Sequence, residues 1–379
     1  MCWYECRHSI YSQFYTEVPA PIADERNELM NVIDLFSGCG GLSKGFLDAG
    51  CEVLLGVDID QAALNTFERN HPGSVGLNGS LADAQTFEKM QQFVGNRKID
   101  LIVGGPPCQG FSLTGPRNFD DERNKLYLSY IKAVEIFRPK GFIIENVPGM
   151  ATLYKGEVKN EILKRFKRLG YNIDCRVLCA ADYGVPQIRK RLVFIAIRKE
   201  FGAVSFPEPL VSPEHYVTSR EAIDDLPSLE TNLGEETCGY EVKPRTAYQK
   251  KMRGACTTLS NHTATLHKDF VKTVIAQVPE GGNYKDLPKG VGEHRKFHMA
   301  WTRCDGHKPS RTIDTGHRNY FHYEYNRIPT VRESARLQSF PDDFVFTGTR
   351  TQQYRQVGNA VPPMLGYALA KHLMKLVKK

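Results

Sequence analysis

The stretch from residue 31 to residue 58 reads NVIDLFSGCGGLSKGFLDAGCEVLLGVD and contains a complete strand, turn, helix and strand pattern. A short apolar run leads into a glycine-rich turn, a helix-like stretch follows, and a second apolar run ends at Asp58. Small residues in such a turn let backbone amides approach a ligand at the N-terminus of the helix. An acidic side chain after the second strand can accept hydrogen bonds from both hydroxyls of a ribose. The combination predicts a nucleoside cofactor site, although a tight turn alone also explains the glycines.

The turn does not match the common phosphate-binding motifs. It lacks the G-x-G-x-x-G spacing of dinucleotide-binding proteins, and no Walker-type lysine follows it. A pyrophosphate is therefore a poor fit, and the turn better suits the amino-acid end of S-adenosylmethionine.

The alternation of strands and helices continues along the chain. Apolar runs typical of strands lie at 98–105, 140–147, 171–180 and 190–198, and helical patterns lie at 126–138 and 159–170. This order favours an α/β fold with a doubly wound, mostly parallel sheet, helices on both faces, and ligands at the carboxyl ends of the strands. A last helical pattern at 361–377 predicts a helix that packs back on this domain.

After Lys199 the alternation stops, which indicates a second, smaller domain. Residues 200–239 are acidic and carry four prolines, a composition typical of a linker. Residues 240–320 hold 15 Lys and Arg against 7 Asp and Glu, which favours a surface that binds a polyanion. We therefore expect four parts: an N-terminal extension (1–30), a catalytic and cofactor-binding domain (31–200), a small recognition domain (201–349) and a C-terminal segment returning to the catalytic domain (350–379).

Composition excludes several classes of protein. Of the 379 residues, 41% are hydrophobic and 25% are charged, as in globular domains rather than disordered ones. No apolar run reaches the length of about 18 residues that a membrane span needs, and residues 1–30 lack the apolar core of a signal peptide. We expect a cytoplasmic protein. Ten cysteines without a C-x-x-C pair favour reduced thiols over disulfides or a zinc site, so we expect no metal.

Two further strand ends carry groups that suit catalysis. The third strand leads into GGPPCQGFS at 104–112, where two prolines restrict the loop that holds Cys108. A single cysteine is more often inert packing, but a thiolate in a rigid loop beside a nucleoside pocket is a suitable nucleophile. Glu145 ends the next strand on the same rim, where it supplies an acid–base group.

An arginine-rich motif, QIRKR at 187–191, precedes the last strand of this domain. Alternation along an extended chain points the side chains of Gln187, Arg189 and Arg191 to one side. Structural salt bridges explain the arginines equally well at this point.

Together these motifs resemble the cytosine-C5 DNA methyltransferases of bacterial restriction–modification systems. The family's motifs occur in its order: DLFSGCGG (34–41), GGPPCQGFS (104–112), ENV (145–147), QIRKR (187–191), RIPTVRE (327–333), ARLQSFP (335–341) and QVGNAVPP (356–363). Asp121, Arg123 and Leu126 match its D-x-R-x-x-L element. The resemblance runs from residue 31 to the C-terminus except for 200–320, the part that reads the target sequence in this family.

The resemblance implies transfer of a methyl group from S-adenosylmethionine to carbon 5 of a cytosine. Cys108 attacks carbon 6 of the ring as a thiolate, while Glu145 hydrogen-bonds ring nitrogen 3 and the exocyclic amine. Arg189 and Arg191 hold the extruded nucleotide, and Gln187 assists its positioning. The target cytosine must leave the stacked duplex, and phosphate contacts from the basic segment compensate for that cost.

The resemblance also implies a set of cofactor contacts, in the first turn, at the ends of the following strands and near the C-terminus: Asp34, Phe36, Ser37, Gly38, Cys39, Gly40, Gly41, Asp58, Ile59, Asp83, Pro106, Leu126, Asn359 and Val361. One departure is visible. Where the family often has Gly-Asp-Ile, this chain reads Gly79-Ser80-Leu81, so either Ser80 or Asp83 contacts the adenine amino group.

The implied partner is double-stranded DNA, read by the basic segment. Asn261, His262 and Arg303 are candidates for base contacts there. A restriction endonuclease acting separately is a further implied partner, and we expect a monomer with no membrane contact. We also expect that residues 1–30 are dispensable for activity, since the motifs begin directly after them.

Three other functions are less favoured. A branch similar to this family methylates tRNA, but its characteristic Cys-Phe-Thr tripeptide is absent here. A catalytically silent nucleic-acid-binding homologue is disfavoured because Cys108, Glu145, Arg189 and Arg191 are all present. A thiol oxidoreductase is least favoured, since the chain lacks both C-x-x-C and a nicotinamide or flavin fingerprint.

Overall fold

Seven strands form the central sheet of the computed structural model, which describes residues 29–107, 125–293, 300–315 and 320–378. The strands stand in the order β3-β2-β1-β4-β5-β8-β6. Their bounds are β1 (Asn31–Leu35), β2 (Glu52–Asp58), β3 (Val75–Asn78), β4 (Leu101–Gly104), β5 (Gly141–Asn146), β6 (Tyr171–Cys179) and β8 (Lys190–Arg198). The first five pair in parallel, and β8 lies antiparallel between β5 and β6. The expected doubly wound, mostly parallel sheet is confirmed.

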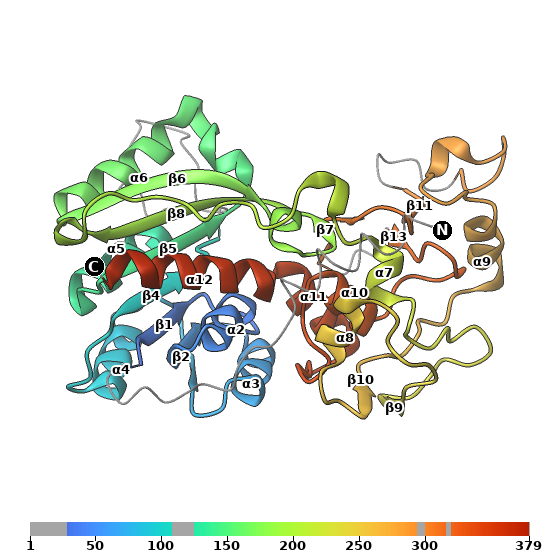
Figure 1. Cartoon of the computed structure of the whole chain (residues 1–379), viewed down its shortest axis with the longest axis horizontal. Helices are drawn as coiled ribbons and strands as arrows, with labels where there is room; N and C mark the ends of the chain where they lie inside the picture. The colour runs from blue at the N-terminus through green and yellow to red at the C-terminus, as the bar shows by residue number, and fades with distance from the viewer. Residues whose placement is uncertain (1–28, 108–124, 294–299, 316–319, 379) are drawn as a thin grey trace, which may run out of the picture.

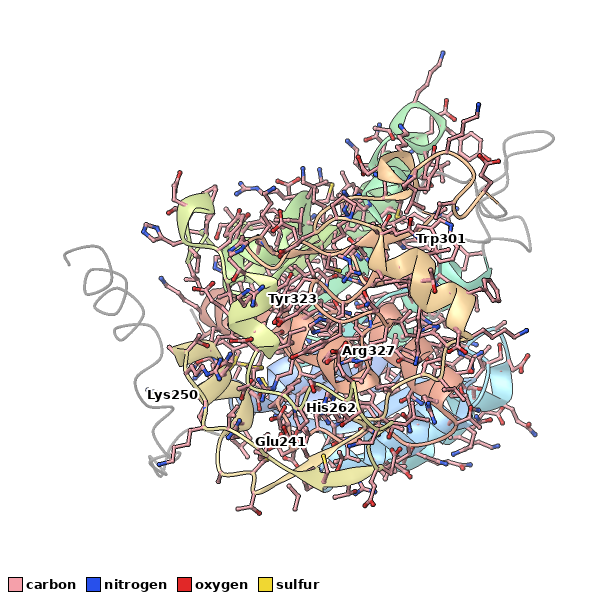
Figure 2. The ribbon with its side chains drawn as sticks, turned by 90° about the vertical axis from the view of Figure 1, so that its right-hand side faces the viewer. Glu241, Lys250, His262, Trp301, Tyr323 and Arg327 are labelled. Carbon is pink, nitrogen blue, oxygen red and sulfur yellow. The ribbon has the colours of Figure 1, made fainter. Side chains whose placement is uncertain are left out.

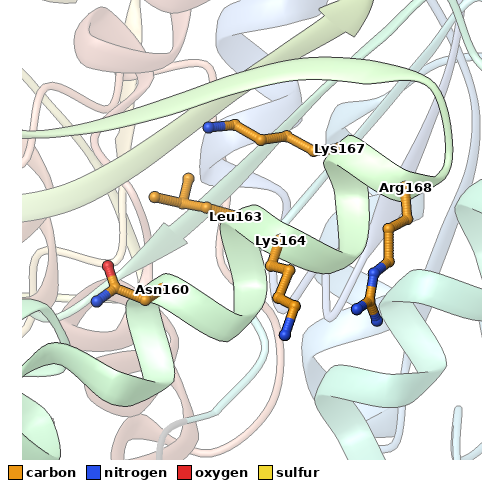
Figure 3. A pocket seen from close by; sticks show the side chains of 5 residues that line it. All are labelled: Asn160, Leu163, Lys164, Lys167 and Arg168. Atoms are coloured by element: carbon orange, nitrogen blue, oxygen red, sulfur yellow. The ribbon is translucent and has the colours of Figure 1, made fainter.

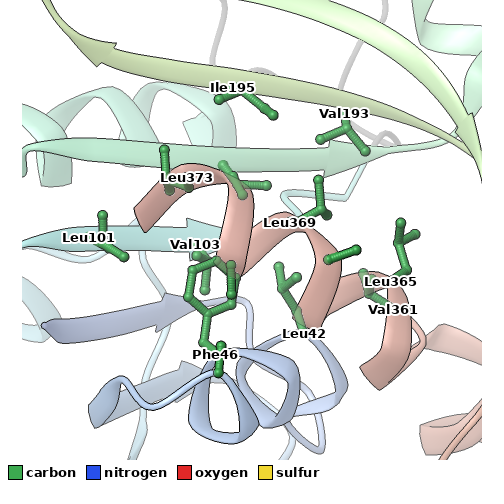
Figure 4. Close-up of a cluster of buried hydrophobic side chains, with 14 of the residues drawn as sticks. Leu42, Phe46, Leu101, Val103, Val193, Ile195, Val361, Leu365, Leu369 and Leu373 are labelled. Carbon is green, nitrogen blue, oxygen red and sulfur yellow. The ribbon is translucent and has the colours of Figure 1, made fainter. Parts of the chain in front are cut away.

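Helices cover both faces of this sheet (Figure 1). One face is covered by α2 (Gly41–Asp48), α3 (Gln61–Asn70) and α12 (Pro363–Val377), and the other by α4 (Ala84–Val94), α5 (Lys125–Phe137) and α6 (Glu157–Arg168). Strand residues alternate between two apolar clusters, as the pleat requires. Val103 faces α2 and α12 (Figure 4). Val32 packs in the same cluster, whereas Ile33 and Ile102 face the other helices.

The C-terminal helix α12 confirms the helix expected at 361–377 and lies directly against α2. A Cβ on Gly45 of α2 would clash with the backbone of α12 at Tyr367, and a Cβ on Gly366 would lie 2.7 Å from the Leu42 carbonyl oxygen. The two helices approach so closely because glycines face each other, and their contact places the start of α12 beside the first turn.

The second lobe lies to the right of the sheet in Figure 1. Its helices are α7 (Ser219–Ile223), α8 (Ala247–Arg253), α9 (Asp269–Ala276), α10 (Val331–Leu337) and α11 (Arg350–Asn359). Its strands are very short: β9 (Thr237–Gly239) pairs with β10 (Thr258–Ser260), and β11 (Thr302–Arg303) pairs with β13 (Tyr320–Phe321). A further pair, β7 (Gln187–Ile188) with β12 (Ser310–Arg311), joins the lobe to the segment that enters β8.

Helix α10 is buried along its whole length and carries charged side chains into the core of this lobe. Arg336 pairs with Asp342 at 2.6 Å and with Asp225 at 3.1 Å, and Asp225 also pairs with Arg253 at 2.6 Å. Buried charges persist only when they are paired in this way. The prediction of a linker at 200–239 is wrong for this part of the stretch, because the Asp225 carboxylate is a core partner of α10.

Candidate active site

The turn between β1 and α2 requires its glycines for both conformation and packing. Gly38 and Gly40 have φ angles of 53° and 88°, in the left-handed region. The Gly38 amide donates to Asp58 Oδ2 over 2.8 Å, which holds the turn against the end of β2. A Cβ on Gly41 would clash with the Val361 carbonyl oxygen. The turn therefore forms a narrow cradle between β2 and the segment that leads into α12.

The other expected residues of the turn differ in their surroundings. Phe36 has a φ of 58° and is half-buried, and the buried Ser37 hydroxyl has no hydrogen-bond partner within the described parts of the chain. Cys39 is buried with its Sγ 3.7 Å from the Gln356 carbonyl oxygen. Burial raises the pKa of the Cys39 thiol to about 12, so this thiol stays protonated and acts as packing.

Asp34 lies on β1 next to this turn and is only 1% exposed. Its Oδ2 atom has no hydrogen-bond partner among the residues described. Burial raises the pKa of Asp34 from 3.8 to about 7; hydrogen bonding to Ser43 opposes this shift, and the charge of Asp58 adds to it. A buried carboxyl group with one unused oxygen suits a ligand that brings an ammonium group.

The acidic end of β2 lies beside the start of α4. Asp58 accepts from the Asp60 amide over 2.9 Å as well as from the turn, and the Gly79 amide donates to its carbonyl oxygen over 3.0 Å. The neighbouring Ile59 is 72% exposed, which leaves an apolar surface for a planar ring. The Ser80 hydroxyl accepts from the Ala82 amide, whereas the Asp83 carboxylate is exposed and does not cap α4. Asp83 is thus the freer of the two candidates for the adenine contact.

Strand β5, which carries Glu145, is hydrogen-bonded to the start of the loop that contains Cys108. The Asn146 side-chain amide donates to the carbonyl oxygen of the buried Pro106 over 2.9 Å. A Cβ on Gly105 would lie 2.9 Å from Glu145 Oε2, so the loop leaves β4 directly beside the carboxylate. Cys108 itself, together with Asp121 and Arg123, lies outside the described residues.

Glu145 and the two arginines form one charged group. Glu145 Oε1 lies 2.8 Å from Arg191 Nε. Burial raises the pKa of Glu145, and the positive charges of Arg191 and Arg189 oppose that shift. Arg189 is 1% exposed; its Nη2 donates to the Gly358 carbonyl oxygen over 3.0 Å, while its Nε and Nη1 lack partners among the described residues. Burial and the neighbouring Arg191 lower the pKa of Arg189 to about 9. Two buried guanidinium nitrogens without a partner favour an acceptor supplied by a ligand.

The alternation predicted at 187–191 is confirmed, but Gln187 does not join this charged group. Its side chain is fully buried; Nε2 donates to Gln338 Oε1 over 2.8 Å, and Oε1 accepts from the Ile313 amide over 3.2 Å. Ile188, next to it, is exposed. Gln187 therefore connects the two lobes through protein contacts.

The remaining cofactor candidates differ in their surroundings, and only Val361 contacts the turn. Asn359 is exposed at the end of α11, Val361 is buried against Gly41, and Leu126 is half-buried in the first turn of α5. The roles of Asn146 and Gln338 were not expected from the sequence, although both residues stand inside motifs quoted for other reasons.

The structure excludes the three candidates for base contacts, because all of them are buried (Figure 2 labels His262). The His262 ring bonds the Thr330 hydroxyl and the Pro227 carbonyl oxygen. Arg303 donates to five backbone carbonyl groups, and Asn261 bonds the Phe346 backbone. Basic side chains that remain exposed among the described residues of this region are Lys243, Arg245, Lys250, Lys251, Lys268, Lys272, Lys285, Lys289, Lys308 and Arg311.

A basic hollow of about 440 Å³ lies on α6, lined by Asn160, Leu163, Lys164, Lys167 and Arg168 (Figure 3). None of the expected catalytic or cofactor residues lines it, so it is separate from the candidate site. Among the described helices none is long and apolar enough to cross a membrane. Within the same residues, no group of His, Cys, Asp and Glu has the arrangement of a metal site.

Known proteins resemble this chain over most of its length. The sequence profile described as C-5 cytosine-specific DNA methylase matches residues 30–375. The type II methyltransferase M1.HphI of Haemophilus parahaemolyticus is 40% identical over 354 residues, covering 92% of this chain and 87% of the relative. The type II methyltransferase M.DdeI of Desulfomicrobium norvegicum is 37% identical over 369 residues, covering 91% and 88%.

Solved structures show the same fold. A prophage-encoded E. coli protein described as a DNA modification methyltransferase superposes with a TM-score of 0.76 at 31% identity, covering 92% of this chain and all of that one. The Entamoeba histolytica methyltransferase EhMeth superposes with a TM-score of 0.62 at 17% identity, covering 93% of this chain and all of that one, a likeness of fold alone.

Proposed function

The chain belongs to the C-5 cytosine-specific DNA methylase family and is a DNA cytosine-5-methyltransferase, and we propose that it is the modification enzyme of a type II restriction–modification system. Its substrate is a cytosine within a specific duplex sequence, turned out of the helix for reaction. Its relatives' names support this role. The protein acts as a monomer on DNA in the bacterial cytoplasm, separately from its cognate endonuclease.

The chemistry rests on a covalent step, because carbon 5 of cytosine is a weak nucleophile. The Cys108 thiolate adds to carbon 6, and the electron pair of the ring double bond moves onto carbon 5, which then takes the methyl group. Loss of the carbon 5 proton and expulsion of the thiolate restore the aromatic ring. Glu145 hydrogen-bonds nitrogen 3 and the exocyclic amine, so that the charge formed by addition is stabilised.

One observation carries this proposal. The Glu145–Arg191 pair at 2.8 Å stands beside Gly105, three positions before Cys108, with the unpaired N–H groups of Arg189 next to it. A carboxyl group for the pyrimidine edge and guanidinium donors for its carbonyl oxygen or phosphate therefore share one rim with the nucleophile's loop.

S-adenosylmethionine fits the cradle of the first turn, and when bound it supplies an electrophilic methyl group. Asp58 would accept the ribose hydroxyls, and the exposed Ile59 would cover one face of the adenine. Asp34 and the unpartnered Ser37 hydroxyl would serve the amino-acid end. Asn359 and Val361 close the cradle from the C-terminal side.

The small lobe would present the duplex. Its exposed lysines, such as Lys250 and Lys272, suit contacts to phosphates, which position DNA without reading its sequence. We retain the division into a catalytic part (31–200), a recognition part (201–349) and a returning segment (350–379) as part of this proposal, preceded by a dispensable extension (1–30).

A trapping experiment tests the mechanism. A duplex carrying 5-fluorocytosine at the target should leave a persistent covalent adduct with the protein, because fluorine cannot depart as a cation from carbon 5. Cys108→Ser should form no adduct, and Glu145→Gln should form it at least about 100-fold more slowly. Cys256→Ser, in the small lobe, is the matched control and should react as the wild type does. An adduct with Cys108→Ser, or tRNA methylated in preference to DNA, would refute the assignment.

A further inference from the structure

Two fully buried glutamines bridge the lobes beside the active site. Gln187 lies two residues before Arg189, and its Nε2 donates to Gln338 Oε1 over 2.8 Å and to the Leu337 carbonyl oxygen over 3.2 Å. Gln338 follows α10 in the small lobe. A hydrogen-bonded amide pair without access to water has a defined geometry, because any shift leaves a buried polar group unsatisfied.

The second amide bond of Gln338 reaches the segment 357–361. Its Nε2 donates to the Val357 carbonyl oxygen over 2.6 Å and to the Ala360 carbonyl oxygen over 3.2 Å. Carbonyl groups in the last turn of a helix lack intrahelical partners, so a side-chain donor decides where such a turn ends. Gln338 thus fixes the end of α11 on both sides of Asn359.

The same segment contacts both halves of the active site. Toward the cofactor cradle, a Cβ on Gly41 would clash with the Val361 carbonyl oxygen, and Cys39 Sγ approaches the residue before Val357. Toward the catalytic rim, the Gly358 carbonyl oxygen accepts the one hydrogen bond that the Arg189 side chain makes to a described residue. Gly358 itself is packed against the Asp314 backbone and has no room to move in that direction.

We propose that Gln338 is a positioning residue that couples the cofactor site to the nucleotide site. Gln338 holds residues 357–361 between Gln187 and the cradle. Cofactor bound at Asn359 and Val361 therefore affects the position of the Gly358 carbonyl group. That carbonyl group in turn sets the direction of the Arg189 guanidinium. This inference rests on the proposed function, since it assumes that Asn359 meets the cofactor and Arg189 the extruded nucleotide.

The coupling is a measurable quantity. For the wild type, S-adenosylhomocysteine should tighten binding of a target duplex by roughly 5- to 150-fold, and by linkage the duplex should tighten S-adenosylhomocysteine by the same factor. Both dissociation constants can be measured by fluorescence anisotropy and calorimetry on the full chain.

Gln338→Met keeps the length and volume of the side chain but removes its hydrogen bonds. We expect the coupling factor to fall to below twofold, with the affinity for duplex alone changed less than twofold, and with KM for S-adenosylmethionine raised more than kcat is lowered. Gln353→Met is the matched control, because Gln353 is buried in α11 and bonds the Gly348 carbonyl oxygen, away from 357–361. It should keep the wild-type coupling.

The outcomes separate the two proposals. If the wild type methylates DNA and Gln338→Met keeps the wild-type coupling factor, this inference alone is overturned. The same holds if the wild type shows no coupling, or if Gln353→Met loses as much coupling as Gln338→Met. Absence of DNA methylation by the wild type would instead overturn the proposed function. Should Gln338→Met fail to fold, Gln187→Met removes the amide pair from the other side, and unchanged coupling in that variant would also refute the inference.

Discussion

The Asn146 side chain lies 2.9 Å from the Pro106 carbonyl oxygen, so that β5 and the loop leaving β4 share one rigid frame. Asn146 directly follows the acid Glu145, and Pro106 stands two positions before Cys108. A buried hydrogen bond therefore fixes Pro106, in the segment that leads to Cys108, relative to the strand that carries Glu145.

Asn146→Ala should slow methyl transfer by about 100-fold, because a misplacement of about 1 Å in reacting groups has an effect of that size. Binding of S-adenosylhomocysteine should stay within twofold of the wild type, since the cradle does not involve Asn146. Single-turnover kinetics and calorimetry measure the two quantities. Asn172→Ala is the control: its side chain on the edge strand β6 also bonds a backbone carbonyl group, at Gly202 over 2.7 Å, but this bond is exposed to solvent, and the change should leave both quantities unaltered.

Asp34 should make the stability of the protein depend on pH. Burial raises the pKa of Asp34 from its ordinary value of 3.8 to about 7, so the folded state holds an extra proton between these values. The free energy of unfolding therefore falls as pH rises from about 4 to 7, by roughly 4 kcal/mol in total, and the loss is complete above pH 7.

Asp34→Asn should remove this slope and raise the free energy of unfolding at pH 8. Urea titrations at pH 5, 6, 7 and 8 measure it. Asp48→Asn, which changes an exposed carboxylate paired with Lys44, should keep the wild-type slope. An identical slope in Asp34→Asn and the wild type would show that another group titrates.

Removing the Asp225 carboxylate should destabilise the small lobe strongly. Asp225→Ala leaves the buried Arg336 and the partly buried Arg253 without one of their counter-charges, at a cost of about 3–5 kcal/mol. Glu324→Gln removes a solvent-exposed pair with Arg220 and should cost less than about 1 kcal/mol. Thermal unfolding followed by circular dichroism compares the two, and equal losses would contradict the importance of burial.

Gly45→Ala should also destabilise the fold, although alanine is the better helix former. The added methyl group would overlap backbone atoms of α12, which cannot rotate away, so a net loss of about 1–3 kcal/mol is expected. Gly239→Ala adds a methyl group in open space and should change stability by less than about 1 kcal/mol. Chemical denaturation measures both variants; a neutral Gly45→Ala would mean that α2 and α12 can separate at little cost.

The first lobe was predictable because its strands and helices are long enough to show periodicity. The antiparallel direction of β8 was not, since an apolar run reads the same in either direction. In the small lobe most strands have two or three residues, too short for any pattern, and its arginines carry the same letters whether they meet DNA or a buried carboxylate. The prediction for Arg303 was wrong because the sequence does not show that its guanidinium meets buried backbone carbonyl groups, and the acidic stretch 200–239 does not show that Asp225 pairs with buried arginines. The candidate site followed from residues at strand ends, whereas the links through Asn146 and Gln338 depend on contacts between distant segments.

The packing of α12 against α2 has a consequence for biosynthesis. The helix that completes the first apolar cluster leaves the ribosome after every strand and helix that it packs against, so the cofactor cradle cannot close before residues 363–377 have emerged, however early its glycine turn does. A message cut short before residue 363 would therefore yield a protein that contains the segment 104–112 but cannot methylate DNA.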